Sequence, residues 1–229
     1  MASVRGLKRC VVVAVLWWCG TGARALAQDT GFVGAAAGVS TLSTDGASRT
    51  TEDSIGVSLY APENGLLLHV FGGVHVTDYL SVQGNYSWQQ NDLTLVSHTS
   101  AMDESAFYEQ RRNSVQHAVS ADLLLYFRDR RSWARPYLSA GIGVVHFTSR
   151  ADVIVVSWGA PRLPPLEFSS RSPALKVAVG IDLTLGRAWS FRYSFSETLR
   201  QNPVSRQLSP QGVRSLANFQ SVFGAVKRF

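Results

Sequence analysis

The stretch that decides the fold runs Ala174-Leu-Lys-Val-Ala-Val-Gly-Ile-Asp-Leu-Thr-Leu185, where large apolar residues alternate with small or polar ones. Every odd-numbered position from 175 to 185 is Leu, Val or Ile, and the even-numbered positions carry Ala, Lys, Gly, Asp and Thr. A helix would scatter the apolar side chains around its circumference, whereas a strand places all of them on one face. The stretch is therefore predicted to be a β-strand with one apolar and one mostly polar face.

The same period of two recurs along most of the chain. The following segment alternates Trp189, Phe191, Tyr193 and Phe195 with Ser190, Arg192, Ser194 and Ser196. Counting both, the segments with this pattern cover about 33–39, 66–76, 80–88, 119–127, 138–144, 174–185, 189–196 and 216–229. We expect about eight strands, each near or above the ~9–11 residues that a tilted strand needs to cross a bilayer.

The connections between these segments alternate between short and long. The short ones are Thr77-Asp78, Arg128 to Ala134 and Gly186-Arg187. The long polar ones span about 42–65, 92–112, 150–172 and 198–214. This asymmetry is typical of outer-membrane barrels. The sequence predicts an all-β fold, an up-and-down antiparallel transmembrane β-barrel of eight strands with short periplasmic turns and long extracellular loops.

The chemistry of the two faces indicates which one meets lipid. An eight-stranded barrel has an interior that only just holds its side chains, so the face with large aromatics belongs outside. Aromatic girdles are expected at both interfaces. We assign Tyr79, Trp133, Tyr137, Trp189 and Phe229 to the turn side, and Tyr86, Trp88, Phe147, Phe195 and Phe219 to the loop side. The alternative is a soluble lipocalin-like barrel with the two faces reversed.

The N-terminal segment has the features of a cleavable secretory signal. A basic start precedes an apolar run, and Ala25-Leu-Ala27 fits the pattern read by signal peptidase, so residues 1–27 are predicted to be removed and 28–229 to form the barrel. A lipoprotein cut before Cys19 is the rival reading, which Trp17 and Trp18 disfavour.

Removal of this segment changes the composition of the chain. The formal net charge of +6 includes four basic residues of the segment, Arg5, Lys8, Arg9 and Arg24, so the mature chain carries +2. Both cysteines also leave, which excludes disulfides and thiolate metal sites. Nucleic-acid binding loses its main support. No later segment has the ~18 apolar residues of a membrane-spanning helix.

Two stretches carry a resemblance to a known group of proteins. Arg135-Pro-Tyr-Leu-Ser-Ala-Gly-Ile-Gly-Val-Val-His-Phe147 and Phe223-Gly-Ala-Val-Lys-Arg-Phe229 resemble strands of the small OmpA/OmpX-type outer-membrane β-barrel superfamily. The resemblance implies that Phe223 and Phe229 belong to the signal read by the barrel-assembly machinery. Lys227 departs from the pattern, which has an apolar or aromatic residue at that position. Members of the superfamily act as anchors, adhesins, serum-resistance factors and enzymes.

Four charged residues fall on the predicted inner face: Asp122, Lys176, Asp182 and Arg192. Buried charges must be paired to be tolerated. We therefore expect a luminal charge network in which Lys176 and Arg192 pair with Asp122 and Asp182. The neighbouring polar partners would be His69, Gln83, Asn85 and Gln116. A gated narrow pore, opened by rearrangement of these pairs, is the functional alternative to a purely structural polar core.

Catalysis is the remaining alternative. A lipid A-modifying barrel enzyme needs a base beside a hydroxyl nucleophile on one face of a strand, together with an acid that orients the base. The candidates are His98 with Ser100 and Glu104 or Glu109, and His146 with Thr148. The five histidines do not form a ligand pattern, so no metal and no cofactor are expected.

Taken together, these features predict a monomeric, non-enzymatic protein of the outer membrane. Its expected role is in envelope structure or in surface recognition through the long loops. The expected partners are outer-membrane lipid, lipopolysaccharide and the barrel-assembly machinery.

Overall fold

The computed structural model describes residues 30–101, 105–157 and 163–229, and the predicted signal segment lies outside these ranges. Ten strands are present in the described residues: β1 (Gly31–Leu42), β2 (Asp45–Thr51), β3 (Ser54–Pro62), β4 (Gly65–His75), β5 (Leu80–Ala101), β6 (Ser105–Tyr126), β7 (Ala134–Val156), β8 (Glu167–Thr184), β9 (Trp189–Gln201) and β10 (Ser215–Arg228). A short 3-10 helix, η2 (Ser205–Gln207), lies between β9 and β10. None of the described residues forms a helix long and apolar enough to span a membrane.

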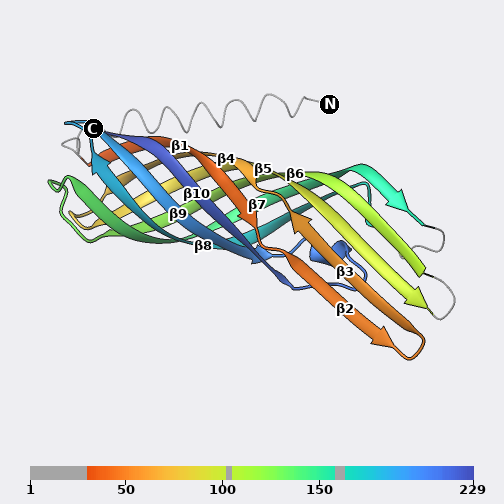
Figure 1. Cartoon of the computed structure of the whole chain (residues 1–229). Coiled ribbons are helices and arrows are strands. Elements are labelled where there is room, and N and C mark those ends of the chain that lie inside the picture. The colour runs from red at the N-terminus through yellow and green to blue at the C-terminus, as the bar shows by residue number, and fades with distance from the viewer. Residues whose placement is uncertain (1–29, 102–104, 158–162) are drawn as a thin grey trace, which may run out of the picture.

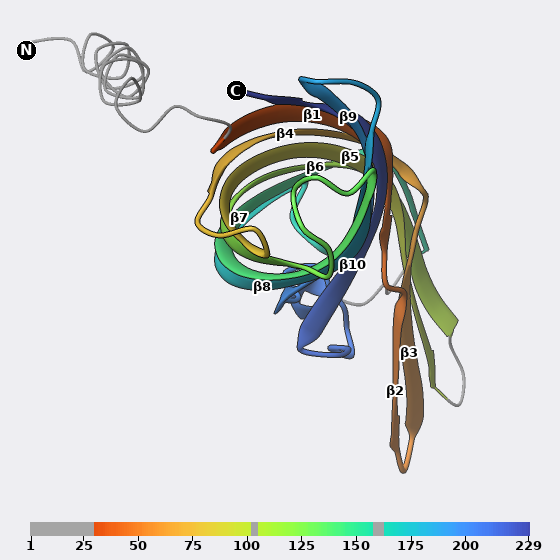
Figure 2. The same ribbon diagram turned by 90° about the vertical axis from the view of Figure 1, so that its left-hand side faces the viewer.

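Eight of the strands close into a ring, which confirms the predicted up-and-down antiparallel barrel. Each of the strands from β4 to β10 pairs antiparallel with the next, and β1 closes the ring by pairing with both β4 and β10. Figure 2 shows the ring along its axis. At one end of the barrel, which we call the turn end, residues 76–79, 127–133 and 185–188 connect neighbouring strands. The opposite end is called the loop end.

The outer wall of the ring is apolar. Its exposed large side chains include Val33, Val39, Leu66, Leu68, Val70, Val74, Val82, Val119, Leu123, Leu138, Ile142, Leu175, Val177, Val179, Phe195 and Phe223. Tyr79, Trp133, Trp189 and Phe229 lie exposed towards the turn end. Such a surface is unfavourable in water and suits the hydrocarbon core of a bilayer. We call this surface the lipid-facing belt.

The prediction that Tyr137 and Phe147 belong to the lipid-facing aromatic girdles is wrong. Tyr137 and Phe147 are buried and point into the barrel. Both have the same parity as Gly141 and Gly143, which belong to the inner face of β7, so strict alternation sends them inward. Gly180 on the neighbouring strand provides the space, because a Cβ there would overlap the Tyr137 ring.

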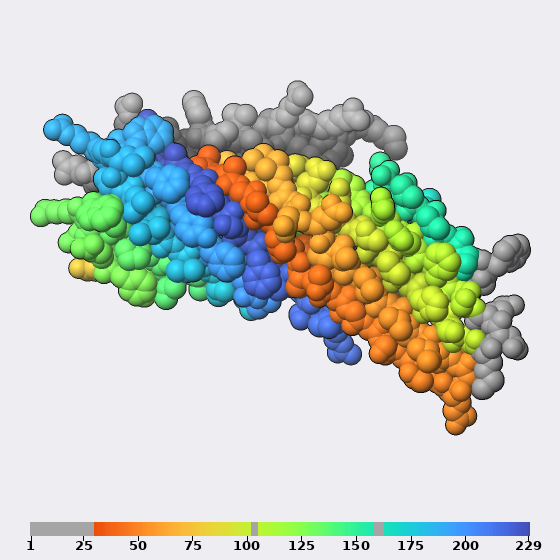
Figure 3. Space-filling view, viewed as in Figure 1, coloured from red at the N-terminus to blue at the C-terminus, as the bar shows by residue number. Residues whose placement is uncertain are grey.

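Three of the four predicted polar links at the loop end, 42–65, 92–112 and 150–172, are largely strand in their described residues, whereas most of 198–214 is a connection between β9 and β10. Residues 42–65 contain the hairpin of β2 and β3, and β3 pairs with the distal part of β5. At 22 or 23 residues each, β5, β6 and β7 run far beyond the ~9–11 needed to cross a bilayer. The extension projects past β1 and β10 (Figures 1 and 3).

The sequence pattern missed this extension because the alternation inverts at the edge of the lipid-facing belt. Leu93, Leu95 and Tyr108 are buried inside, whereas Asp92 and Arg111 on the same strands face outward. Beyond the lipid, water lies outside the sheet, and these apolar residues turn inward as in a soluble protein, although others on the extension, such as Ile55, Val57 and Val153, stay exposed.

Candidate functional site

The inner face of the ring holds the four charged residues predicted to form a network. They come from β6, β8 and β9, and the structure brings them together in two separate ion pairs. Arg192 pairs with Asp182 in the next strand, at a position where the two residues are directly opposite. Lys176 pairs with Asp122 across the lumen-facing Gly141 of β7, whose register position lies between them.

The Arg192–Asp182 pair is bidentate and deeply buried. Nε of Arg192 lies 2.5 Å from Oδ1 of Asp182, and Nη2 lies 2.7 Å from Oδ2. The guanidinium also donates to Tyr126 Oη at 2.9 Å and to Gln83 Oε1 at 2.6 Å. Arg192 is 3% exposed. This geometry satisfies both oxygens of the carboxylate, which a planar guanidinium does better than a lysine.

The Lys176–Asp122 pair lies next to smaller polar side chains. Nζ of Lys176 is 3.0 Å from Oδ2 of Asp122, and Ser120 donates to Oδ1 at 2.8 Å. Asn85 donates to the Ser120 hydroxyl at 3.2 Å and contacts His69 Nε2 at 3.0 Å. The predicted neighbours Gln83, Asn85 and His69 therefore join the charged residues directly or through one further side chain.

Gln116 lies elsewhere, with an arginine that the sequence reading did not place in the lumen. Arg200 donates from Nη2 to Gln116 Oε1 at 2.9 Å, and its guanidinium lies 4.9 Å from the centre of the Phe147 ring. Its Nε and Nη1 atoms are buried without a partner among the described residues. Alternation alone could have placed Arg200 in the lumen, since it lies an even number of residues from Arg192 on β9 and therefore on the same inner face.

Very little open space remains around the ion pairs. One cavity of about 20 Å³ lies beside His69, Ser120 and Lys176, and another of about 10 Å³ lies beside Asp122 and Arg192. A single water needs on the order of 10–15 Å³ on this measure, so each cavity holds about one.

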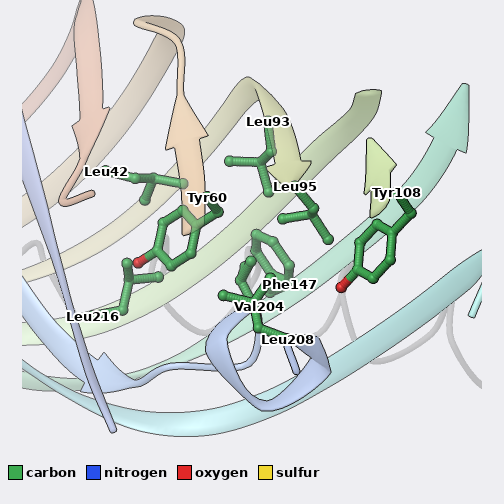
Figure 4. Close-up of a cluster of buried hydrophobic side chains, with 9 residues drawn as sticks. All are labelled: Leu42, Tyr60, Leu93, Leu95, Tyr108, Phe147, Val204, Leu208 and Leu216. Atoms are coloured by element: carbon green, nitrogen blue, oxygen red, sulfur yellow. The ribbon is translucent and has the colours of Figure 1, made fainter. Parts of the chain in front are cut away.

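An apolar cluster closes the loop end of the barrel. It joins residues from the extended strands with residues of the β9–β10 connection (Figure 4), and its members are Leu42, Tyr60, Leu93, Leu95, Tyr108, Phe147, Val204, Leu208 and Leu216. Burial raises the pKa of Tyr60 to about 12, although its hydroxyl accepts a hydrogen bond from Asn202 at 3.1 Å. The connection therefore folds into the mouth of the barrel.

Arg112 fastens the β7–β8 connection to the wall of the extension. The buried guanidinium donates to Ser149 Oγ at 3.0 Å, Gln110 Oε1 at 2.7 Å and the carbonyl oxygens of Ser149, Pro165 and Leu166 at 3.0–3.2 Å. Burial lowers its pKa to about 10, so Arg112 is charged at neutral pH with neutral acceptors around it. The sequence reading treated this residue as the end of a loop and missed its role.

A groove of about 870 Å³ lies on the outer side of these connections. It is lined by parts of β2, of the β7–β8 connection and of η2 with the residues after it: Ser48, Arg49, Leu163, Pro164, Pro165, Arg206, Gln207, Leu208, Ser209, Pro210 and Gln211. Ser97 donates to the Ser209 carbonyl at 2.6 Å and Ser58 donates to that of Pro210. Together with Arg112, these bonds hold the groove from beneath. No acidic side chain is among its lining residues.

The candidate catalytic pairs have little of the geometry that catalysis needs. His146 Nε2 is 3.4 Å from Thr148 Oγ1 on the outer face of β7, but its cross-strand neighbours are His117 and Arg171 rather than a carboxylate. His98 and Ser100 lie on the outer face of β5, and Glu104 lies outside the described residues. In the described part of the chain, no cluster of His, Cys, Asp and Glu could hold a metal.

Phe223 and Phe229, assigned to the assembly signal, both lie on the lipid-facing side of β10. The Phe223 ring packs 4.9 Å from that of Tyr193. The backbones of Phe229 and Gly31 exchange two hydrogen bonds of 3.0 Å, so the last residue takes part in closing the ring. Lys227 points out beside Trp189, with Nζ 6.0 Å from the ring centre.

A closed antiparallel barrel with an apolar belt and a polar, filled lumen defines the class of integral outer-membrane β-barrels. The sequence matches the outer membrane protein beta-barrel domain family over residues 12–214, and the chain belongs to this family. It is an outer-membrane protein that sits among membrane lipids. No curated protein matches the sequence.

The chain is similar to several solved structures at low sequence identity. Neisserial surface protein A is 12% identical with a TM-score of 0.48, over 87% of this chain and 97% of that chain. OprG from Pseudomonas aeruginosa is 12% identical with a TM-score of 0.48, over 88% of this chain and 97% of that chain. The outer membrane protease OmpT from Escherichia coli is 8% identical with a TM-score of 0.44, over 89% of this chain and 98% of that chain.

Proposed function

We propose that this protein is a non-enzymatic, non-conducting barrel that recognises anionic ligands at the cell surface through its loop end. The observation that carries the proposal is the groove between β2, the β7–β8 connection and η2, held in place by buried hydrogen bonds. Ordered loops on a rigid scaffold are where barrels and other folds place binding sites.

The orientation belongs to the same proposal. Short connections at the turn end and extended strands at the loop end match the usual arrangement of outer-membrane barrels, with turns in the periplasm and loops outside. We further propose that the protein acts as a monomer, that lipopolysaccharide surrounds its outer half, and that the assembly machinery reads Phe223 and Phe229.

The lumen argues against a pore. An open path would require separation of both ion pairs and removal of the apolar cluster, while the remaining cavities hold about one water each. An enzyme is disfavoured by the surroundings of His146, where Arg171 occupies a place that an orienting carboxylate would need.

The ligand class follows from the lining of the groove. Arg49 and Arg206 are exposed there, and no acidic lining residue offsets their charge. Guanidinium groups bind sulfate, phosphate and carboxylate groups through paired hydrogen bonds. A volume of about 870 Å³ is that of a small-molecule site, enough for a few sugar rings.

The test uses the mature chain refolded into phosphatidylcholine nanodiscs and dextran sulfate as the probe, with neutral dextran as a second probe. We expect dextran sulfate to bind and neutral dextran not to bind. The double variant Arg49→Gln/Arg206→Gln should bind at least tenfold more weakly. The control Arg111→Gln/Arg150→Gln removes the same charge at the loop end outside the groove and should bind like the wild type.

Equal weakening in both double variants would reduce the effect to net charge and overturn the recognition site. Conductance in planar bilayers tests the closed lumen separately. Neither the wild type nor Asp182→Ala should give channel steps, and regular steps in the wild type would favour the pore.

A further inference from the structure

A second pocket, of about 480 Å³ and partly open, lies at the turn end of the barrel. Its lining comes from three different connections, from the end of β4 and from the last strand: His75, Asp78, Asp129, Arg130, Arg131, Arg187 and Arg228. Residues that are far apart in sequence thus surround one space. Four arginines face two aspartates, so the lining is basic.

The two carboxylates of the pocket are already engaged. Asp78 accepts a hydrogen bond from Arg130 Nε at 2.8 Å. Asp129 accepts three bonds of 3.0 Å within its own turn, from the Ser132 hydroxyl and the backbone amides of Arg131 and Ser132. These bonds, the Ser132 hydroxyl first, lower the pKa of Asp129, so it stays ionised and locked in the turn.

In the part of the chain that the structure describes, three arginines of the lining have no ion pair, although the ionised Asp129 lies close enough to offset part of the charge of Arg131. Among the described residues, no carboxylate lies within 4 Å of the guanidinium of Arg131, Arg187 or Arg228. Arg228 is fixed by donating from Nη2 to Thr184 Oγ1 at 3.5 Å and to the Gly186 carbonyl at 3.4 Å. Its Nε is nevertheless buried without a partner.

A fifth arginine lies next to this group. Arg135 is buried at the same end, where its Nη2 donates to the Asp78 carbonyl at 3.0 Å and its plane stacks 3.8 Å from the Tyr126 ring. Its Nε also has no partner in the described part of the chain. Both Nε atoms are buried and Arg135 is not among the lining residues, so this arginine adds positive charge beside the pocket rather than a further donor inside it.

We propose that the turn-end pocket binds a phosphate-bearing anion, held mainly by Arg131, Arg187 and Arg228. Forked guanidinium groups match the oxygens of phosphate, and several of them lining one pocket distinguish a binding site from scattered interfacial arginines. With the orientation proposed above, the pocket faces the periplasm. Its existence does not depend on recognition at the loop end, because the closed lumen lies between the two.

The source of the phosphate is either a free phosphorylated compound or the headgroup of an anionic lipid. The experiment uses the full mature chain in nanodiscs of phosphatidylcholine, or of phosphatidylcholine with one fifth phosphatidylglycerol. Inorganic pyrophosphate is titrated into each by calorimetry at 0.15 M salt. The variants are Arg187→Gln, Arg131→Gln/Arg187→Gln and the loop-end control Arg150→Gln, all at exposed positions that leave the barrel core unchanged.

In phosphatidylcholine we expect saturable binding that weakens about tenfold in Arg187→Gln, further in the double variant, and not in Arg150→Gln. Weaker pyrophosphate binding in the phosphatidylglycerol discs would show that the lipid headgroup competes for the site. Equal binding in both discs would assign the site to free phosphates. Absence of pyrophosphate binding, or equal affinity in Arg187→Gln and the wild type, would overturn the proposal.

Discussion

Removal of the charge of Asp182 should destabilise the barrel far more than removal of an exposed carboxylate. In Asp182→Asn, the amide oxygen can accept only one of the two short bonds and carries no charge. The Arg192 cation then stays buried without an ion-pair partner, 4.7 and 5.1 Å from the ring centres of Phe71 and Tyr137. Breaking one side of a buried pair costs about 3–5 kcal/mol. The contacts with the two rings and the hydrogen bond to Gln83 remain, so we expect the free energy of unfolding to fall by about 3 kcal/mol.

The control is the Arg150–Glu167 pair at the loop end. Its atoms are 2.9 Å apart, but the side chains are 73% and 53% exposed, so Glu167→Gln should cost about 0–1 kcal/mol. Urea unfolding in lipid vesicles, followed by tryptophan fluorescence, measures the loss of stability in Asp182→Asn and in Glu167→Gln. With slopes of about 1–3 kcal/mol/M, Asp182→Asn should lower the midpoint by about 1–3 M. The double variant Arg192→Met/Asp182→Leu should recover most of the loss. If Asp182→Asn and Glu167→Gln had equal effects, the lumen would be hydrated and the reasoning wrong.

Two other predictions concern the extension. Arg112→Met removes five hydrogen bonds and should make the β7–β8 connection at least tenfold more sensitive to proteinase K in nanodiscs; an unchanged cleavage rate would deny Arg112 its fastening role. Tyr60 has its pKa raised to about 12 by burial. Its unfolded form ionises near pH 10, so the stability contributed by the neutral hydroxyl is complete below pH 10 and is lost as the pH rises towards 12. Tyr60→Phe should remove this part of the alkaline loss of stability, and the difference in absorbance at 295 nm between wild type and variant should place the transition near pH 12 rather than 10.

The part of the fold inside the membrane was predictable because one physical rule acts along every strand there. Lipid requires apolar side chains outside and the narrow ring requires small or polar ones inside, so the alternation around Leu175 and Val177 repeats in eight segments. The extension was not predictable by the same rule. Past Asp92 the outer medium is water, and the inversion that brings Leu93 and Tyr108 inward weakens the signal that marked the strand.

The candidate site likewise has a part that the alternation predicts and a part that it does not. Parity along β8 and β9 was enough to place Lys176, Asp182 and Arg192 on the inner face. The partner of each charge depends on the stagger between strands, which alternation alone does not determine. Arg112 was missed for a different reason, because three of its five acceptors are backbone carbonyl oxygens, two of them in a connection that is distant in sequence. A backbone acceptor has no residue type, so no pattern in the sequence could indicate it.

These features together imply that the two ends of the barrel act independently. The groove beside Arg49 and the pocket beside Arg187 both attract anions, but two ion pairs and an apolar cluster lie between them. A ligand could pass only by separating Arg192 from Asp182, at a cost of the size argued above. Coupling between two sites requires an element with two arrangements that both ligands bias. The structure has one arrangement of these side chains, with cavities of about one water each beside them. Saturation of the pocket with pyrophosphate should therefore leave the affinity of the groove for dextran sulfate unchanged.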